Sequence, residues 1–258
     1  VAKALGKTGK WGGLVLLGKA PINAGTGTNN VEGLTGYPYG GTMPSDNSGT
    51  LRYVRIWHGG AIVGADNEIN GLTLAGVGSL TTVEHVEVAF NADDGFEWFG
   101  GTVDGKWLSA IYCLDDSFDV DEGWQGRVQY AVAIVGTNGT PAAEIDSGSS
   151  TDTDRLPRSH PSFYSATFIM AGDAHSESNN PLMRLREGTG GKFANIILTG
   201  LAGTHDGVMM ADCGSHSYTQ TLPPLGTSVG VASDNTASAG FLYFSPNNII
   251  YDSRATFT

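Results

Sequence analysis

The chain has 258 residues, 38 of them glycine, a charged fraction of only 16% and a formal net charge of −12. This acidity argues against nucleic acid or an anionic membrane surface as the main partner, because both would repel the protein. No apolar run approaches the roughly 18 residues that span a bilayer. Frequent glycine and few charges favour many short strands and turns over a helical enzyme, and at this length we expect one domain over residues 1–258.

In chain order, short apolar segments alternate with glycine-rich corners, beginning with Leu14–Leu17. Three later segments share one spacing, in which apolar residues follow at intervals of three and then two. They are Leu51-x-x-Val54-x-Ile56, Val83-x-x-Val86-x-Val88 and Phe193-x-x-Ile196-x-Leu198. Such alternation indicates half-buried strands, and the glycines between them supply the positive φ angles that tight corners need.

The segments also recur with an internal period. Asp93-Asp-Gly-Phe-Glu97 returns as Asp115-Asp-Ser-Phe-Asp119, an offset of 115 − 93 = 22 residues. A period of this length indicates a solenoid, whose coils bury their apolar faces against one another. We therefore predict an all-β, right-handed parallel β-helix with about 22 residues per coil, in which residues 137–161 form a loop excursion. A β-sandwich or jelly roll is the alternative.

Four segments carry a resemblance to a known family. They are Lys10–Asn23, Leu51–Ile56, Glu68–Gly78 and Asp93–Gly101. Their sequences resemble those of a family of secreted proteins and lipoproteins common in Bacteroidota, most of whose members have no assigned reaction. The resemblance implies a right-handed parallel β-helix of pectate-lyase-like shape, exported from the cell, and it implies no catalytic residue.

Acidic residues concentrate in the segment from Glu84 through Glu122, which we call the acidic ridge. It holds eleven carboxylates against one basic residue, Lys106, and so carries −10 of the net charge of −12. In a parallel solenoid, equivalent residues of neighbouring coils lie about 4.8 Å apart, so stacked carboxylates would repel unless a cation or a proton intervenes. Clustered oxygen ligands favour calcium. The candidate ligands are Asp93, Asp94, Asp115, Asp116 and Asp119; the alternative is that these acids cap turns and face solvent.

Aromatic residues offer a second candidate surface. Flat rings can stack on sugar rings, so an exposed set would indicate glycan binding, whereas a buried set would be core. The set is Trp57, Trp98, Trp107, Tyr112 and Trp124. Phe96 and Phe118 lie one period apart and are expected to stack inside the solenoid.

A polysaccharide-acting enzyme would need carboxylates and a base to converge. The available bases or substrate clamps are Lys106, Arg127, Arg184, Arg186 and Lys192. Cys113 and Cys213 either pair or remain buried thiols. His205, Cys213 and His216 would permit a zinc site, although their spacing matches no recognised zinc motif.

The sequence as a whole favours a non-catalytic extracellular module, structural or adhesive, stabilised by calcium and associating with neighbouring chains as a homo-oligomer or filament. A glycan-binding module and a calcium-dependent, lyase-like enzyme are the alternatives. The chain begins at Val1 without Met or a signal-peptide pattern, which is typical of a processed product or of a fragment of a larger protein.

Overall fold

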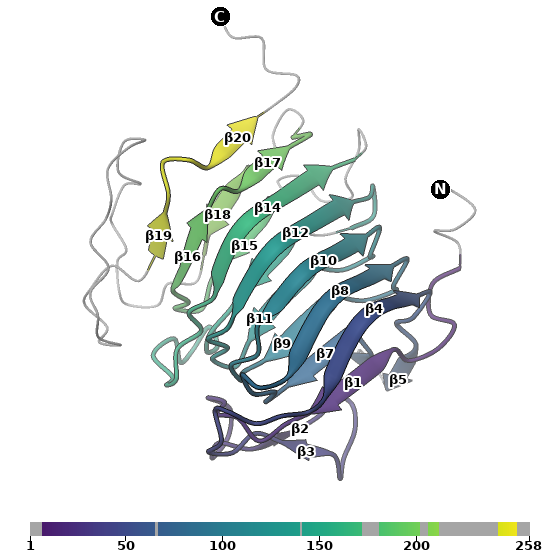
Figure 1. Ribbon diagram of the computed structural model, residues 1–258, viewed down its shortest axis with the longest axis vertical. Coiled ribbons are helices and arrows are strands. Elements are labelled where there is room, and N and C mark those ends of the chain that lie inside the picture. Colours follow the sequence, from purple (N-terminus) through teal and green to yellow (C-terminus); the bar gives the residue numbers. More distant parts are fainter. Residues whose placement is uncertain are drawn as a thin grey trace, which may run out of the picture.

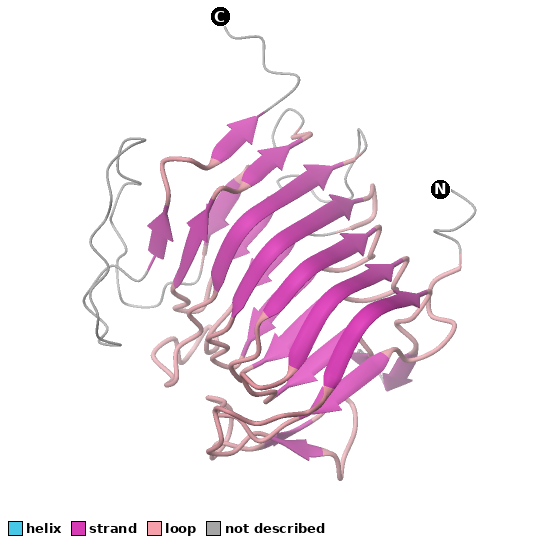
Figure 2. Cartoon of the chain, viewed as in Figure 1, coloured by secondary structure: helices cyan, strands magenta, loops and turns pink. Residues whose placement is uncertain are grey.

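The computed structural model describes residues 7–64, 67–139, 141–171, 181–201, 206–211 and 242–251. These residues form strands, turns and loops, with two long parallel sheets packed face to face (Figures 1 and 2). None of them forms a helix long and apolar enough to cross a membrane.

Each long sheet takes its strands from successive turns of the chain. The seven-stranded sheet runs β1 (Leu14–Leu17), β7 (Leu72–Ala75), β9 (Phe96–Phe99), β11 (Phe118–Asp121), β13 (Ala143–Ile145), β15 (Met183–Leu185) and β18 (Val208–Met210). The nine-stranded sheet runs β4 (Thr50–Trp57), β8 (Thr82–Ala89), β10 (Gly105–Ile111), β12 (Arg127–Val135), β14 (Ser162–Met170), β16 (Gly191–Ala194) and β19 (Leu242–Phe244). It is completed by β17 (Ile197–Thr199), which pairs with β14, and β20 (Ile249–Tyr251), which pairs with β17.

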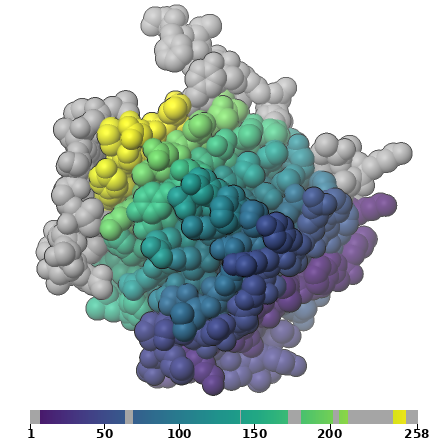
Figure 3. Space-filling view, in the orientation of Figure 1, coloured from purple at the N-terminus to yellow at the C-terminus, as the bar shows by residue number. Residues whose placement is uncertain are grey.

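From β7 to β16 the chain visits the two long sheets alternately, and neighbouring strands within each sheet are parallel. This is the arrangement of a parallel β-helix, so the predicted fold is confirmed. The space-filling view shows the coils as successive bands of colour lying against one another in chain order (Figure 3).

The register matches the repeat seen in the sequence. Phe96 pairs with Phe118 and Glu97 with Asp119, each at an offset of 22 residues. Elsewhere loops lengthen the coil, as between Val128 and Phe163, where the offset is 163 − 128 = 35. Residues 137–161 were expected to form a loop excursion, but they include a strand of the seven-stranded sheet, β13.

Two small antiparallel pairs complete the described strands. They are β2 (Asn29–Asn30) with β3 (Pro38–Tyr39), and β5 (Ile62–Gly64) with β6 (Asn67–Glu68). The β2–β3 pair belongs to a long connection between β1 and β4 that covers part of the outer face of the seven-stranded sheet. Ile22, Val31 and Tyr39 from this connection pack against Ala75 and Phe99.

The long strands of the nine-stranded sheet bend at one residue with positive φ. In β10, Gly105, Leu108 and Ala110 are buried while Lys106 and Trp107 both face outward. Two successive outward residues require a bend, which Trp107 supplies with φ of 53°. The interval of three in the sequence pattern is therefore the bend, and the following interval of two is ordinary strand alternation.

The same conformation recurs at the equivalent position of successive strands. The residues are Tyr53, His85, Trp107, Tyr130, Ser165 and Asn195, with φ between 53° and 61°. We call these six residues the bend row. A left-handed conformation costs a residue with a side chain roughly 1–2 kcal/mol, so the row has to be held by the packing on either side of it.

The core between the sheets is a continuous stack of aromatic and aliphatic side chains. Phe96 and Phe118 are fully buried with ring centroids 5.3 Å apart, which confirms the predicted interior pair. Trp98 stacks on Trp124 at 4.7 Å, and both are fully buried. Such stacks add to the hydrophobic stabilisation that a solenoid shares between neighbouring coils.

Candidate functional site

The outward side chains of the seven-stranded sheet form a row of charges along the solenoid. The register places Thr73, Glu97, Asp119, Glu144 and Arg184 at equivalent positions of successive strands. Carboxylates therefore follow one another on three adjacent strands before a cation appears. This is the stacking of like charges that the 22-residue repeat predicted, and it needs compensation.

Arginines provide that compensation at one end of the row. Arg184 donates from Nη1 to Glu144 at 2.9 Å, and Arg186 donates from Nε to Asp146 at 2.7 Å. Arg186 also lies 2.5 Å from the second carboxylate oxygen of Glu144. Glu144 and Asp146 are almost fully buried, so these ion pairs neutralise charges that would be costly without a partner.

Asp94, Glu97 and Asp119 form a second carboxylate group, farther along the row, which we call the acidic cluster. Each offers an oxygen within 4.8 Å of the others, and Asp94 and Glu97 are buried. Burial, reinforced by the neighbouring carboxylates, raises the pKa of Asp94 and of Asp119 well above the usual range. The Asn70 side-chain amide donates to Glu97, but one oxygen of Asp119, Oδ1, is buried without a hydrogen-bond partner.

Asp94 also contributes to a neighbouring group of carboxylates in the turns before β9 and β11. Asp93, Asp94 and Asp115 have oxygens within 4.8 Å of one another. Asp94 accepts a hydrogen bond of 2.8 Å from the backbone N–H of Asp116, which is buried. Asp94 therefore accepts a backbone hydrogen bond that links the turns of two coils, as the turn-capping interpretation predicts. It also contributes an oxygen to a carboxylate group, as the metal-site interpretation predicts.

Four of the five predicted ligands, Asp93, Asp94, Asp115 and Asp119, therefore belong to two overlapping groups that share Asp94. Asp116 belongs to neither group and contributes its backbone N–H to Asp94. Carboxylate oxygens at these separations suit a hard divalent cation such as calcium, which takes six to eight oxygen ligands. Calcium binding itself stays a prediction. Glu97 was not among the predicted ligands, although its alignment with Asp119 in the repeat carried the necessary signal.

The acidic ridge does not form one surface. Glu84 and Glu87 point outward from the nine-stranded sheet, where they form ion pairs with Arg52 at 3.0 Å and Arg55 at 3.4 Å. Asp104 is held by Arg127 in an exposed pair. The repeat keeps residues in register, but the bends and corners decide the face on which each one lies.

The bend row places an aromatic stack on the outer face of the nine-stranded sheet. Ring centroids lie 4.6 Å apart between Tyr53 and His85, 4.4 Å between His85 and Trp107, and 5.8 Å between Trp107 and Tyr130. The planes are inclined by 20° or less in every pair. We call these four residues the aromatic ladder.

The aromatic ladder is open to solvent. Tyr53 is 78% exposed, Trp107 42% and Tyr130 46%. Lys106 adds a cation 5.7 Å from the centre of the Trp107 ring. Large contiguous exposed apolar patches mark interaction or ligand-binding sites.

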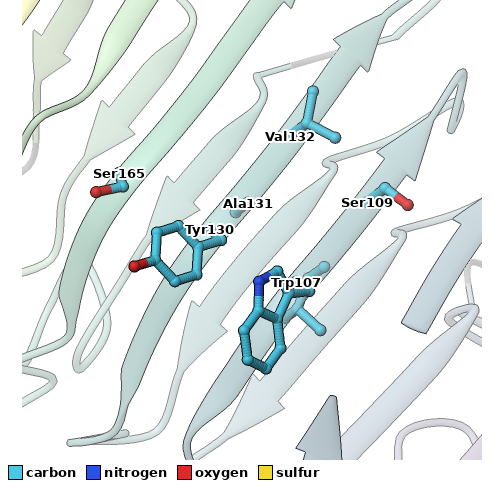
Figure 4. Close-up of a pocket in the computed structure, with 7 residues that line it drawn as sticks. Trp107, Ser109, Tyr130, Ala131, Val132 and Ser165 are labelled. Carbon is cyan, nitrogen blue, oxygen red and sulfur yellow. The ribbon is translucent and has the colours of Figure 1, made fainter. Parts of the chain in front are cut away.

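A shallow groove lies beside the ladder, over β10, β12 and β14. Its lining consists of Trp107, Leu108, Ser109, Tyr130, Ala131, Val132 and Ser165. Figure 4 shows the rings of Trp107 and Tyr130 over neighbouring strands, with Ser109 and Val132 farther along those strands and Ser165 on the next strand. The groove thus combines aromatic walls with hydroxyl groups.

A family model described as a pectate-lyase like beta helix domain matches residues 2–221. The chain belongs to this family. No curated protein and no solved structure gives a significant match to the chain. The shared solenoid of a pectate-lyase like beta helix domain explains why the strands stack in register, while the chemistry of its two faces depends on this chain's own residues.

In this pectate-lyase like beta helix domain, the predicted aromatic set divides between surface and core. Trp57 and Trp107 are exposed, Trp98 and Trp124 are buried core residues, and Tyr112 is partly buried at a corner. Sequence reasoning missed Tyr53 and Tyr130 as surface aromatics. The strand pattern could have identified both, because each directly precedes the second apolar residue of its strand.

The predicted bases do not gather in one place either. Arg184 and Arg186 lie beside the buried carboxylates of the seven-stranded sheet, Arg127 pairs with Asp104, and Lys106 lies by the aromatic ladder. Lys192 lies in β16, at the far end of the nine-stranded sheet. Cys113 is a buried thiol whose pKa burial raises to about 12; Cys213, His205 and His216 lie outside the described residues.

Proposed function

We propose that this β-helix is a non-catalytic adhesive module that acts outside the cell and binds polysaccharide on the outer face of its nine-stranded sheet. The observation that carries the proposal is the exposed aromatic ladder of Tyr53, His85, Trp107 and Tyr130. Aromatic rings present a large apolar surface with little conformational freedom to lose, which is why they dominate binding surfaces.

The identity of the ladder residues supports a surface role. Bulky aromatic residues are unusual at positive φ, where asparagine and glycine are preferred. Asn195 occupies the same bend row with φ of 56°, so the bend itself does not require a ring. Strained backbone positions with large exposed side chains are typical of functional surfaces.

The separation of the two candidate surfaces favours binding over catalysis. An enzyme acting on polysaccharide would bring carboxylates, a base and sugar-stacking rings to one groove. Here the acidic cluster and the two arginines Arg184 and Arg186 lie on the side of the seven-stranded sheet, whereas the ladder and its groove belong to the nine-stranded sheet. Arg184 and Arg186 are moreover engaged by Glu144 and Asp146.

The acidic cluster fits the same proposal as a stabilising element. A calcium ion held by Asp94, Glu97 and Asp119 would join β9, β11 and the turn between coils, and so fasten adjacent coils to each other. Self-association into a homo-oligomer or filament is a separate proposal, which light scattering over a range of concentrations tests.

Binding to insoluble cellulose, xylan and chitin tests the main proposal. The full chain should remain with at least one of these polymers after washing, and Trp107→Asn should lose most of the bound fraction. Asparagine is suited to the bend, so the fold should persist, as a thermal unfolding curve will show. Tyr37→Asn is the matched control, because Tyr37 is an exposed tyrosine on the connection that covers the other sheet. Equal retention of all three proteins would contradict the proposal.

A further inference from the structure

The aromatic ladder stops at Ser165. Gln129 pairs with Tyr164 and Ala131 with Ala166, so the residue opposite Tyr130 on the next strand is Ser165. Ser165 has the same backbone conformation as the ladder residues, with φ of 57°. The row therefore continues in its backbone while the ring that would stack on Tyr130 is replaced by a hydroxymethyl group.

The groove extends from β10 and β12 to this interruption, where Ser165 forms its border. Ser165 and Tyr130 both line it, together with Trp107 from the preceding strand. Strands are spaced by about 4.8 Å, and the rings of the ladder follow one another at 4.4 to 5.8 Å. A ring placed above Ser165 would meet Tyr130 at the distance at which the ladder rings meet one another.

The chemistry of the lining selects the kind of ring. The seven lining residues carry no charge, and the nearby carboxylates of Glu84 and Glu87 are engaged by arginines. Ser109, Tyr130 and Ser165 offer hydroxyl groups around aromatic and aliphatic surface. A ring with an apolar face and hydroxyl groups on its edge complements both the apolar surface and the hydroxyl groups of this lining. An acidic sugar would be repelled by a protein of net charge −12.

We infer that the groove binds one neutral pyranose ring of a polysaccharide chain, a glucose- or xylose-type unit that stacks on Tyr130 above Ser165 and continues the aromatic ladder. This inference rests on the proposed polysaccharide-binding function and adds the ligand class and the position. The sugar hydroxyls bond to the hydroxyl of Ser165, and Val132, on the strand of Tyr130, contacts the apolar edge of the ring.

The chain itself supplies the variant that tests this position. Ser165→Tyr places a tyrosine where Tyr53 and Tyr130 show that the bend row accepts one, so the side chain fills the groove without demanding a new backbone. Leu80→Tyr introduces the same side chain at an exposed position outside the groove and outside the bend row, and serves as the control.

The measurement is isothermal titration calorimetry with cellohexaose and xylohexaose, and with hexagalacturonate as an acidic comparison. The unaltered chain should bind at least one neutral hexasaccharide more tightly than the acidic one. Ser165→Tyr should weaken that binding at least tenfold, while Leu80→Tyr stays within about threefold. Thermal unfolding midpoints of both variants should match that of the parent chain.

The outcomes separate the two proposals. If Trp107→Asn abolishes binding while Ser165→Tyr binds normally, the polysaccharide-binding face is supported and the groove assignment is wrong. If only hexagalacturonate binds, the neutral ligand class is wrong. If no hexasaccharide and no insoluble polymer binds, the proposed function and this inference both fail.

Discussion

Glu97 of β9 and Asp119 of β11 are register partners whose side chains point outward from adjacent strands of the seven-stranded sheet. Burial is the main cause that raises the pKa of both carboxyl groups, and nearby carboxylates add to it. Protons are therefore held more tightly by the folded chain than by the unfolded chain at this place.

The first prediction concerns pH. Burial also raises the pKa of Asp121 to about 7. A carboxyl group whose pKa is higher in the folded state favours folding fully below its unfolded pKa, near 3.9, and this stability is lost as the pH rises through the folded value. Thermal unfolding in EDTA should thus show a midpoint that falls between pH 4 and pH 8. A midpoint that rises over this interval would contradict the assignment.

The second prediction concerns calcium. An ion that binds only the folded chain adds about 2.7 kcal/mol at a concentration 100 times its dissociation constant. At pH 7.5, millimolar calcium should raise the unfolding midpoint, and Asp119→Asn should remove most of that rise. The control is Asp104→Asn, because Asp104 lies on the other face in an exposed pair with Arg127. An equal response of both variants and the parent would leave the acidic cluster without a calcium site.

The third prediction concerns the core. Phe118 is fully buried between Phe96 and Phe168, with ring centroids at 5.3 and 5.8 Å. Phe118→Ala should reduce the free energy of unfolding by about 3–5 kcal/mol, measured by urea denaturation, because it removes buried surface and leaves a cavity. Leu156→Ala is the surface control and should change stability by less than about 0.5 kcal/mol.

The fourth prediction separates buried from exposed ion pairs. Arg186 is 32% exposed and contacts both Glu144 and Asp146, whereas Arg127 is 70% exposed and contacts Asp104. Arg186→Gln leaves two buried carboxylates without that partner and should cost about 1–3 kcal/mol, less than a fully buried pair would. Arg127→Gln should cost about 1 kcal/mol or less. Similar losses for the two variants in urea denaturation would argue against the proposed burial of the first pair.

The sequence predicted the solenoid and the register well, because both depend on repetition. The recurrence of Phe96 as Phe118 and of Glu97 as Asp119 is a local pattern that the parallel ladder simply reproduces. The repeat could not show on which face of the solenoid each acidic residue lies. That depends on the corner and bend conformations, which change the direction of side chains without changing the spacing of the sequence.

The sequence also did not predict the contacts that long loops bring about. Glu144 meets Arg184 although 184 − 144 = 40 residues separate them, since the coil between β13 and β15 carries a long insertion. The connection between β1 and β4 likewise places Tyr39 against Glu122, to which its hydroxyl donates at 2.8 Å. Neither pair is related by the 22-residue period, so no repeat alignment would have found it.

The bend row has a further consequence for any polymer that lies along the solenoid. Because each coil contributes one residue at the same point of its turn, the ladder rings face one another at separations set by backbone hydrogen bonding. A sugar can therefore stack on a ring at the end of the ladder, and the further units of a longer chain contact only the edges of the other rings. Affinity should therefore rise over the first few units of an oligosaccharide and then level off, so that a short oligomer competes nearly as well, per molecule, as a long one.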